Sequence, residues 1–245
     1  MSDLVVRGIC LFQQKSREKD VEATVFSKDE GFIYVRLTSS LKGGRLNLPL
    51  ASTSELYLSS RSALKHYILR DVKVISTHDS IILDYEKLEC FSFLSKVMLH
   101  VAKYNLEASY SLVEMFINLL DEGLNRILLT AHAIERIFVN EGIFGDYQKC
   151  PFCEKMYEGG EVIGYSYEHN CSCCSSCANV INVLSSKLRN YLRVTQTLTL
   201  RDAVRYPLND VDPIRLLSFE CFRLKKLLRN QQDEIDEFLE RVKNG

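Results

Sequence analysis

Two C-x-x-C pairs constrain the fold of this chain more than any other feature of its sequence. Cys150 and Cys153 form the first pair, Cys174 and Cys177 follow after twenty intervening residues, and six of the nine cysteines lie in this segment. Each pair makes a tight turn that directs two thiolates at one ion, and two pairs at this spacing are typical of a four-thiolate zinc site. Because four thiolates leave no open position for a reacting water, the sequence predicts a structural zinc ion held by these cysteines.

The second pair of ligands has alternatives in its own neighbourhood. Cys171 and Cys174 are also spaced C-x-x-C, and Cys173 and His169 lie beside them. We favour Cys174 with Cys177, because an apolar pattern of helical period follows directly after this pair. The segment between the pairs can form only a small hairpin without a core of its own, and a metal would stabilise it by on the order of 10 kcal/mol. The alternative is that these thiols are ordinary buried or redox-active cysteines.

Composition describes a globular chain without a dominant charge. The 245 residues are 46% hydrophobic and carry a formal net charge of −1, so no global basic field points to nucleic acid. No run of eighteen apolar residues predicts a transmembrane helix, and the first residues lack the pattern of a secretory signal. Nine cysteines with metal-ligand spacing fit a reducing compartment better than a disulfide framework, so we expect a cytoplasmic protein.

The period of the apolar residues divides the chain into two predicted domains. Residues 1–80 hold five short β-rich segments separated by turn signals, which predicts a small β-barrel. Residues 81–245 have helical periodicity and are interrupted by the cysteine-bearing insert at residues 149–178. One helix is predicted over residues 180–194, and a final long helix is predicted to run from Asp212-Pro213 to Leu239. The predicted fold class is therefore α+β.

The sequence lacks the common motifs of catalysis. Gly43-Gly44-Arg45 does not continue into the G-K-[ST] of a P-loop, and neither H-E-x-x-H nor G-x-S-x-G occurs. The C-x-x-C pairs lack the strand and helix context of a thioredoxin-type oxidoreductase, although disulfide exchange by Cys150 and Cys153 is a possible alternative. We therefore expect a protein that is not an enzyme.

Two groups of basic residues are candidates for contacts with phosphates. One group lies in loops and on a strand of the predicted barrel, where OB-type barrels bind oligonucleotides, and aromatic side chains there, such as Tyr34, would stack on bases. The other lies on the helix predicted after the cysteines. The alternative for both groups is a solvated charged face. The candidates are Lys15, Arg17, Lys19, Arg36, Lys42 and Arg45 in the first group, and Lys187, Arg189 and Arg193 in the second.

Several stretches match the motifs of one known family in their order along the chain. Gly8-Ile9-Cys10-Leu11 matches a G-I-V-L strand, residues 24–31 match a strand with its hairpin, and residues 46–50 match an L-x-P stretch. The two C-x-x-C pairs match a zinc-bearing branch. Over nearly its whole length the chain resembles the RecO family of bacterial DNA-repair proteins, which are recombination mediators. It differs in a basic loop reduced to residues 42–45, and in Glu154, where a glycine commonly closes the first turn.

The resemblance implies an OB-fold joined to a helical domain with a zinc insert. It implies sequence-independent binding of single- and double-stranded DNA, annealing of complementary strands and recognition of the single-strand-binding protein SSB. It further implies cooperation with RecR to load RecA onto SSB-coated DNA, in the bacterial cytoplasm at the nucleoid. A second hypothesis follows from the near-neutral charge and the reduced basic loop. It is a zinc-stabilised adaptor that binds only proteins, through an apolar patch on the acidic helices.

Overall fold

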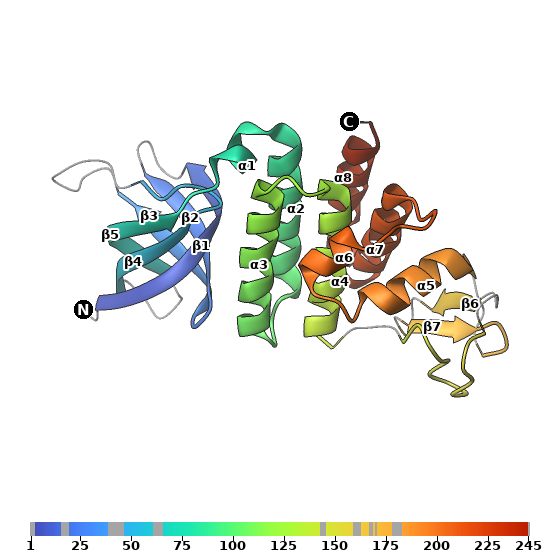
Figure 1. Cartoon of the computed structure of the whole chain (residues 1–245). Helices are drawn as coiled ribbons and strands as arrows, with labels where there is room; N and C mark the ends of the chain where they lie inside the picture. Colours follow the sequence, from blue (N-terminus) through green and yellow to red (C-terminus); the bar gives the residue numbers. More distant parts are fainter. Residues whose placement is uncertain are drawn as a thin grey trace. The chain divides into compact units, whose positions relative to one another are not determined.

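A computed structural model gives an α+β fold, as predicted, in two compact units, Met1–Glu122 and Gly123–Gly245 (Figure 1). Strands give way to helices close to the predicted boundary at residue 80, and the first unit also includes the helices that follow up to Glu122. Within the described part of the chain, no helix has both the length and the apolar character that crossing a membrane requires. The structure describes residues 3–15, 20–38, 47–60, 66–142, 146–158, 163–166, 169, 171–177 and 183–244.

The first unit begins with a closed five-stranded barrel. Its strand order is β1-β2-β3-β5-β4, with β4 returning to pair with β1. Neighbouring strands are antiparallel except β3 and β5, which are parallel. This confirms the predicted barrel, and the order is that of an OB-like fold. The strands are β1 (Asp3–Lys15), β2 (Val21–Ser27), β3 (Gly31–Leu37), β4 (Thr53–Ser60) and β5 (His66–Ser76).

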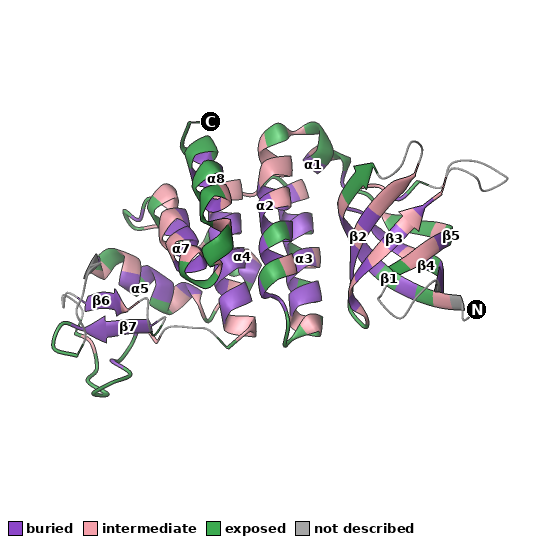
Figure 2. Ribbon diagram, turned by 180° about the vertical axis from the view of Figure 1, so that it is seen from behind, coloured by how far each residue is buried: buried purple, intermediate pink, exposed green. Residues whose placement is uncertain are grey.

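Alternation of side chains along the strands builds the barrel interior. In β3, Ile33 and Val35 are fully buried, whereas Tyr34 and Arg36 lie on the partly exposed outer side, and Figure 2 shows this alternation. Gly8 is required where β1 passes β2, because a Cβ atom there would lie 2.4 Å from Cγ1 of Val25. Such an approach is possible only for a residue without a side chain.

Helices α1 (Asp79–Leu83), α2 (Tyr85–Val101) and α3 (Leu106–Asp121) complete the first unit. Asp84 caps α2 by accepting hydrogen bonds from two backbone amides, and Asn105 caps α3 in the same way from one. The barrel contacts α3 through charged and aromatic side chains. Arg7 pairs with Glu114 at 3.0 Å, Lys28 pairs with Glu107 at 2.6 Å, and the ring of Phe26 lies 6.0 Å from that of Tyr110.

The second unit combines helices with the small sheet of the insert. Strand β6 is central in that sheet and pairs antiparallel with both β7 and β8. The elements are α4 (Arg126–Asn140), β6 (Ile163–Ser166), β7 (Cys171–Cys174), β8 (Val183–Leu184), α5 (Ser186–Thr195), α6 (Leu200–Arg205), α7 (Pro213–Leu227), the 3-10 turn η1 (Arg229–Gln231) and α8 (Gln232–Asn244).

Two predicted helices of this unit have the wrong bounds. The helix predicted over residues 180–194 begins only at Ser186, because Ser185 caps it and the two residues before that cap pair with β6 as β8. The predicted final helix is broken after Leu227 into α7, η1 and α8. The break lets α8 fold back so that its apolar residues are also buried, and Lys225 at the end of α7 pairs with Asp236 on α8.

A buried ion pair joins α7 to its neighbours. Glu220 and Arg223 are buried and pair at 2.9 Å. The Arg223 guanidinium lies 4.2 Å from the ring centre of Phe138 on α4 and 5.5 Å from that of Tyr165 on β6. Burial raises the pKa of Glu220, and the charge of Arg223 opposes that rise. The network therefore fixes the insert strand β6 against the helices.

Because His132 on α4 is buried, we expect the protein to lose stability in acid. The imidazole is buried, with Nε2 2.9 Å from the Tyr191 hydroxyl, and burial together with the charge of Arg136 lowers its pKa to about 3. Below the unfolded pKa of about 6.5 the unfolded chain binds a proton that the folded chain does not. Stability is therefore complete above that pKa and falls as the pH drops towards about 3, by up to about 1.4 kcal/mol per pH unit.

We expect urea unfolding at pH 7 and pH 5.5 to show this difference. The free energy of unfolding of the wild type should fall by about 1 kcal/mol more than that of a His132→Gln variant. An equal fall in the two proteins would contradict the assignment of this pH dependence to His132.

Candidate metal centre and nucleic-acid interface

Four cysteines come together in the insert, and they can hold one metal ion. The sulfur atoms of Cys150, Cys153, Cys174 and Cys177 all lie within 4.8 Å of one another. Sγ of Cys153 lies 3.7 Å from Sγ of Cys174. A tetrahedral ion with Zn–S bonds of about 2.3 Å would separate its sulfurs by about 3.8 Å. The donor set and its spacing therefore fit a four-thiolate zinc ion, with the same four residues that the sequence predicts.

Backbone hydrogen bonds fix the turn that carries the first pair of cysteines. The amide of Glu154 donates to the carbonyl of Cys150 at 2.8 Å, and the amide of Cys150 donates to the carbonyl of Lys155 at 2.9 Å. Glu154 has a positive φ of 58°, a left-handed conformation that glycine adopts without strain. This geometry explains why glycine suits the position that closes the turn. The second pair forms a similar turn, in which the Cys177 amide donates to the Cys174 carbonyl at 3.1 Å.

The electrostatics at Cys150 favour the form that binds metal. Burial raises the pKa of its thiol, but hydrogen bonds from the backbone amides of Cys174, Cys153 and Phe152 outweigh burial and lower the pKa to about 6. Amides directed at a sulfur stabilise the thiolate, which is the state that coordinates a metal. The first ligand of the cluster is therefore prepared by the fold itself.

The three alternative ligands, Cys171, Cys173 and His169, lie outside the group of four sulfurs. Cys173 is buried and packs with Cys150, Cys174 and the partly buried ring of Tyr157. Burial raises the pKa of Cys171 to about 11, which favours its neutral thiol. His169 lies edge-on to another ring of the insert, with 5.0 Å between the ring centres of His169 and Phe152. The metal-binding group found among the described residues contains neither His169 nor the two extra cysteines.

Arg189 attaches the insert to α5. Its side chain is only 2% exposed, and Nη2 donates to the carbonyl of Glu158 at 2.6 Å. The guanidinium also lies 5.6 Å from the ring centre of Tyr157. The sequence predicts a phosphate contact for this arginine, and in this structure its side chain instead packs on the segment that follows the first cysteine pair.

The outer face of the barrel carries an aromatic pair beside a basic residue. Tyr34 on β3 stacks on His66 at the start of β5, with ring centres 5.1 Å apart. Arg36 lies one outward position further along β3, and Nε and Nη2 both donate to Asp20 Oδ2, at 2.9 and 2.5 Å. A pocket of about 130 Å³ is lined by Tyr34, Arg36 and His66 together with Glu22, Tyr67 and Ile68. The stack gives the barrel a flat surface on which a base can lie.

The remaining predicted phosphate contacts fall into two sets. Lys15 is exposed at the end of β1, and Lys187 and Arg193 are exposed on α5. Lys187 pairs with Asp210 at 2.8 Å. The other predicted contacts, Arg17, Lys19, Lys42 and Arg45, lie outside the described residues.

Sequence reasoning missed two features of these surfaces. His66 joins the aromatic pair only because β5 returns parallel to β3, a pairing between distant strands that no local motif reports. The tyrosines beside α5 were likewise not singled out, although Tyr191 follows Lys187 by one helical turn and therefore shares its face.

The fold and these sites define a class of protein. It has an OB-like barrel, a helical region, and four cysteines in a small insert that can hold a metal ion. No protein-family model matches the chain. The chain is similar to the DNA repair protein RecO of Lactobacillus helveticus, with 26% identity over 238 residues. That alignment covers 94% of this chain and 89% of the other.

Proposed function

We propose that this chain is a RecO-like recombination mediator that acts in DNA repair and does not catalyse a reaction itself. The observation that carries the proposal is the similarity to a DNA repair protein RecO over 94% of the chain. A similarity of this extent spans most of both units. The OB-like barrel with its outer aromatic pair supports binding of single strands.

DNA binding would rest on phosphate contacts and stacking, without reading of sequence. Bases stack on Tyr34 and His66, because every base offers a flat face to an aromatic ring. Basic side chains neutralise the phosphates of two strands and so reduce the repulsion that opposes annealing. The proposed phosphate contacts are Lys15, Arg17, Lys19, Arg36, Lys42, Arg45, Lys187 and Arg193, whereas Arg189 would act by positioning the insert.

The partners follow from the same proposal. The protein binds single- and double-stranded DNA, recognises SSB on a coated strand, and acts with RecR so that RecA replaces SSB. Zinc at the four cysteines has a structural role: the ion supplies cross-links between the two turns, and no step of annealing passes through it. The protein would work in the bacterial cytoplasm at the nucleoid.

Strand annealing tests this function directly. Purified protein should anneal two complementary oligonucleotides coated with SSB, without nucleotide, and the rate should fall as salt rises. Each phosphate contact with a single strand contributes about −0.7 to the slope of log affinity against log salt. Roughly four contacts would therefore weaken binding by about 50-fold between about 50 and about 200 mM salt.

Charge reversal at Lys42 and Arg45 supplies a matched comparison. Lys42→Glu with Arg45→Glu should weaken DNA binding and flatten its salt dependence. The control is Arg215→Glu with Arg229→Glu, which makes the same change in net charge at two exposed residues outside the proposed contacts. Equal weakening by both pairs would mean that only total charge matters, and would count against a contact at Lys42 and Arg45.

A protein-only adaptor is the second candidate function, and an exposed apolar group favours it. The group lies at the end of β5 and around α1, and Leu83 is its most exposed member at 86%. Folded, metal-loaded protein that neither retains nor anneals DNA, and that is indifferent to charge reversal at Lys42 and Arg45, would support the adaptor. The apolar group comprises Val74, Ile75, Ile82, Leu83 and Tyr85.

A further inference from the structure

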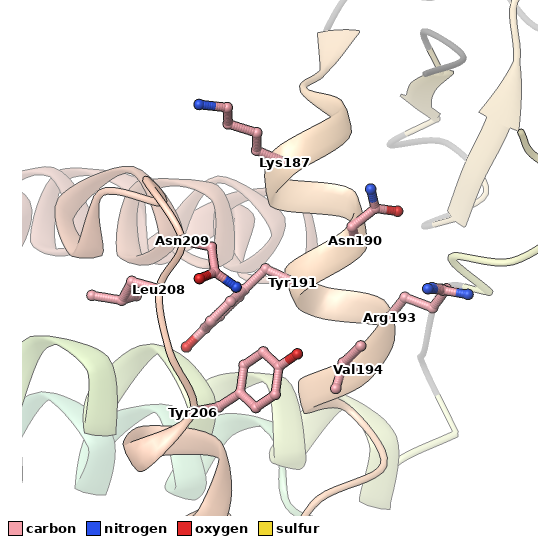
Figure 3. A pocket seen from close by; sticks show the side chains of 8 residues that line it. All are labelled: Lys187, Asn190, Tyr191, Arg193, Val194, Tyr206, Leu208 and Asn209. Atoms are coloured by element: carbon pink, nitrogen blue, oxygen red, sulfur yellow. The ribbon is translucent and has the colours of Figure 1, made fainter. Parts of the chain in front are cut away.

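A pocket of about 350 Å³ opens beside α5 in the second unit, and the metal centre does not account for it. Its walls are one face of α5, the end of α6 and the turn before α7 (Figure 3). Tyr191 and Tyr206 face each other inside it, and Asn209 extends towards them from the turn. Lys187 and Arg193 extend to opposite sides of the rim. The volume falls in the range of sites that hold small ligands.

Buried side chains and a hydrogen-bonded turn fix the walls of the pocket. Tyr191 is buried, its hydroxyl is bonded to His132, and its ring centre lies 5.9 Å from that of Tyr206. Asn209 and Asp210 both have positive φ, at 43° and 69°, and the amide that follows them closes the turn on the Leu208 carbonyl at 2.8 Å. Asparagine and aspartate tolerate this left-handed turn better than other residues with side chains.

The polar groups around the pocket have capacity for a ligand. Among the residues that the structure describes, the side-chain amides of Asn190 and Asn209, the Arg193 guanidinium and the Tyr206 hydroxyl make no hydrogen bond or ion pair. Lys187 pairs with Asp210, but their side chains are 63% and 79% exposed. A pair so exposed contributes little stability, so an anionic ligand can compete for the lysine.

We propose that this pocket binds one unstacked nucleotide of a single-stranded nucleic acid. The base lies on the half-buried ring of Tyr206, and the amides of Asn190 and Asn209 bond its edge. Lys187 and Arg193 take the flanking phosphates. They stand six residues apart on α5, which is about 9 Å along the helix axis. The inference rests on the proposed function, since it gives the same nucleic acid a second contact.

The chemistry of the lining favours a nucleotide over an acidic peptide. An acidic peptide would use the two cations and could bond the amides through its backbone, but it would leave the aromatic face without a matching partner. A nucleotide uses all three kinds of group at once, because it has a flat base, a hydrogen-bonding edge and phosphates.

Two probes of equal charge separate stacking from electrostatics. One is a labelled twelve-residue thymidine oligonucleotide, and the other is a strand of the same length with abasic sugars and no bases. Tyr206→Ala should weaken binding of the thymidine strand by about 5- to 150-fold and leave the abasic strand unchanged. Tyr206→Phe should bind as the wild type does, since it keeps the ring.

Charge and amide variants test the other contacts without disturbing the turn. Arg193→Gln should weaken both strands, whereas Arg215→Gln, at an exposed residue of α7 outside the pocket, should weaken neither. Asn209→Gly keeps the left-handed backbone and should weaken only the thymidine strand. Ultraviolet cross-linking of a bromodeoxyuridine strand to the wild type should modify the peptide that contains Tyr206.

Each contrary result has its own meaning. If the wild type binds the thymidine strand, cross-links arise only in the barrel, and Tyr206→Ala binds normally, the pocket inference is overturned while the proposed function stands. If folded, metal-loaded wild type binds neither strand, both fail. If Tyr206→Ala and Arg193→Gln weaken binding of a poly-glutamate peptide and not of the oligonucleotide, the pocket is a peptide site and the inference is wrong.

Discussion

Replacing Cys150 with serine is expected to abolish stoichiometric zinc binding and to unfold the insert. Cys150 is buried, it lies within 4.8 Å of three other thiols, and its sulfur receives backbone hydrogen bonds that favour the thiolate. A four-thiolate zinc ion contributes on the order of 10 kcal/mol to the folding of a small domain, and three remaining ligands would lose much of that. Metal analysis should find about one zinc per wild-type chain and almost none in Cys150→Ser. Limited proteolysis should then cut the variant between residues 146 and 177.

The neighbouring cysteines provide the control for this experiment. Cys171→Ser and Cys173→Ser should each keep a full complement of zinc, because neither belongs to the metal-binding group. Cys173 is buried, so its variant should lose some stability while it keeps the metal. Loss of zinc in Cys171→Ser together with normal zinc in Cys177→Ser would show that the other C-x-x-C pair supplies the ligands.

Replacing Arg223 with methionine should cost a large part of the stability of the second unit. Arg223 is buried, pairs with Glu220 at 2.9 Å and lies over the ring of Phe138. Removing it leaves the Glu220 carboxyl buried without its cation, and breaking a buried pair in this way costs about 3–5 kcal/mol. Urea unfolding at neutral pH, compared with that of the wild type, measures the loss.

A double variant separates the lost pairing from the lost packing. Changing Glu220 to glutamine together with Arg223→Met removes both charges, so the desolvated carboxylate no longer opposes folding. The double variant should therefore be more stable than Arg223→Met alone. Glu220→Gln alone completes the comparison. If the double variant loses as much stability as Glu220→Gln and Arg223→Met lose together, packing of the guanidinium on the rings, and not the charge pair, dominates.

Local sequence patterns were sufficient to predict the main elements of the fold. Alternating residues in the segment of β2 and the turn signal that ends at Gly31 predicted the barrel strands, because both depend on neighbours in the chain. The spacing of Cys150, Cys153, Cys174 and Cys177 predicted the cluster for the same reason. Each C-x-x-C turn positions its own two sulfurs locally. An ion with four thiolate ligands therefore needs two such turns.

Features that depend on distant contacts could not be predicted in this way. The apolar residues of α7 and α8 follow one helical period in the sequence, because both helices bury an apolar face in the same unit. The period therefore gave no sign that the chain folds back after Leu227. In the sequence Arg223 stands close to Lys225, Lys226 and Arg229, and nothing local distinguishes it from these cations. Its spacing of three residues from Glu220, on an otherwise apolar face, was the available signal of a buried pair.

The parallel pairing of β3 with β5 determines where the barrel opens most easily. Three residue pairs join these strands in the described part of the chain, against seven between β2 and β3. Amide hydrogens at this junction should therefore exchange with solvent before those of the other strand pairs. The junction includes the stacked Tyr34–His66 pair, so a strand that places bases against the outer sides of the two rings would bridge it. A bound strand would then stabilise the closed barrel, so that opening of the barrel and release of the strand would be thermodynamically linked.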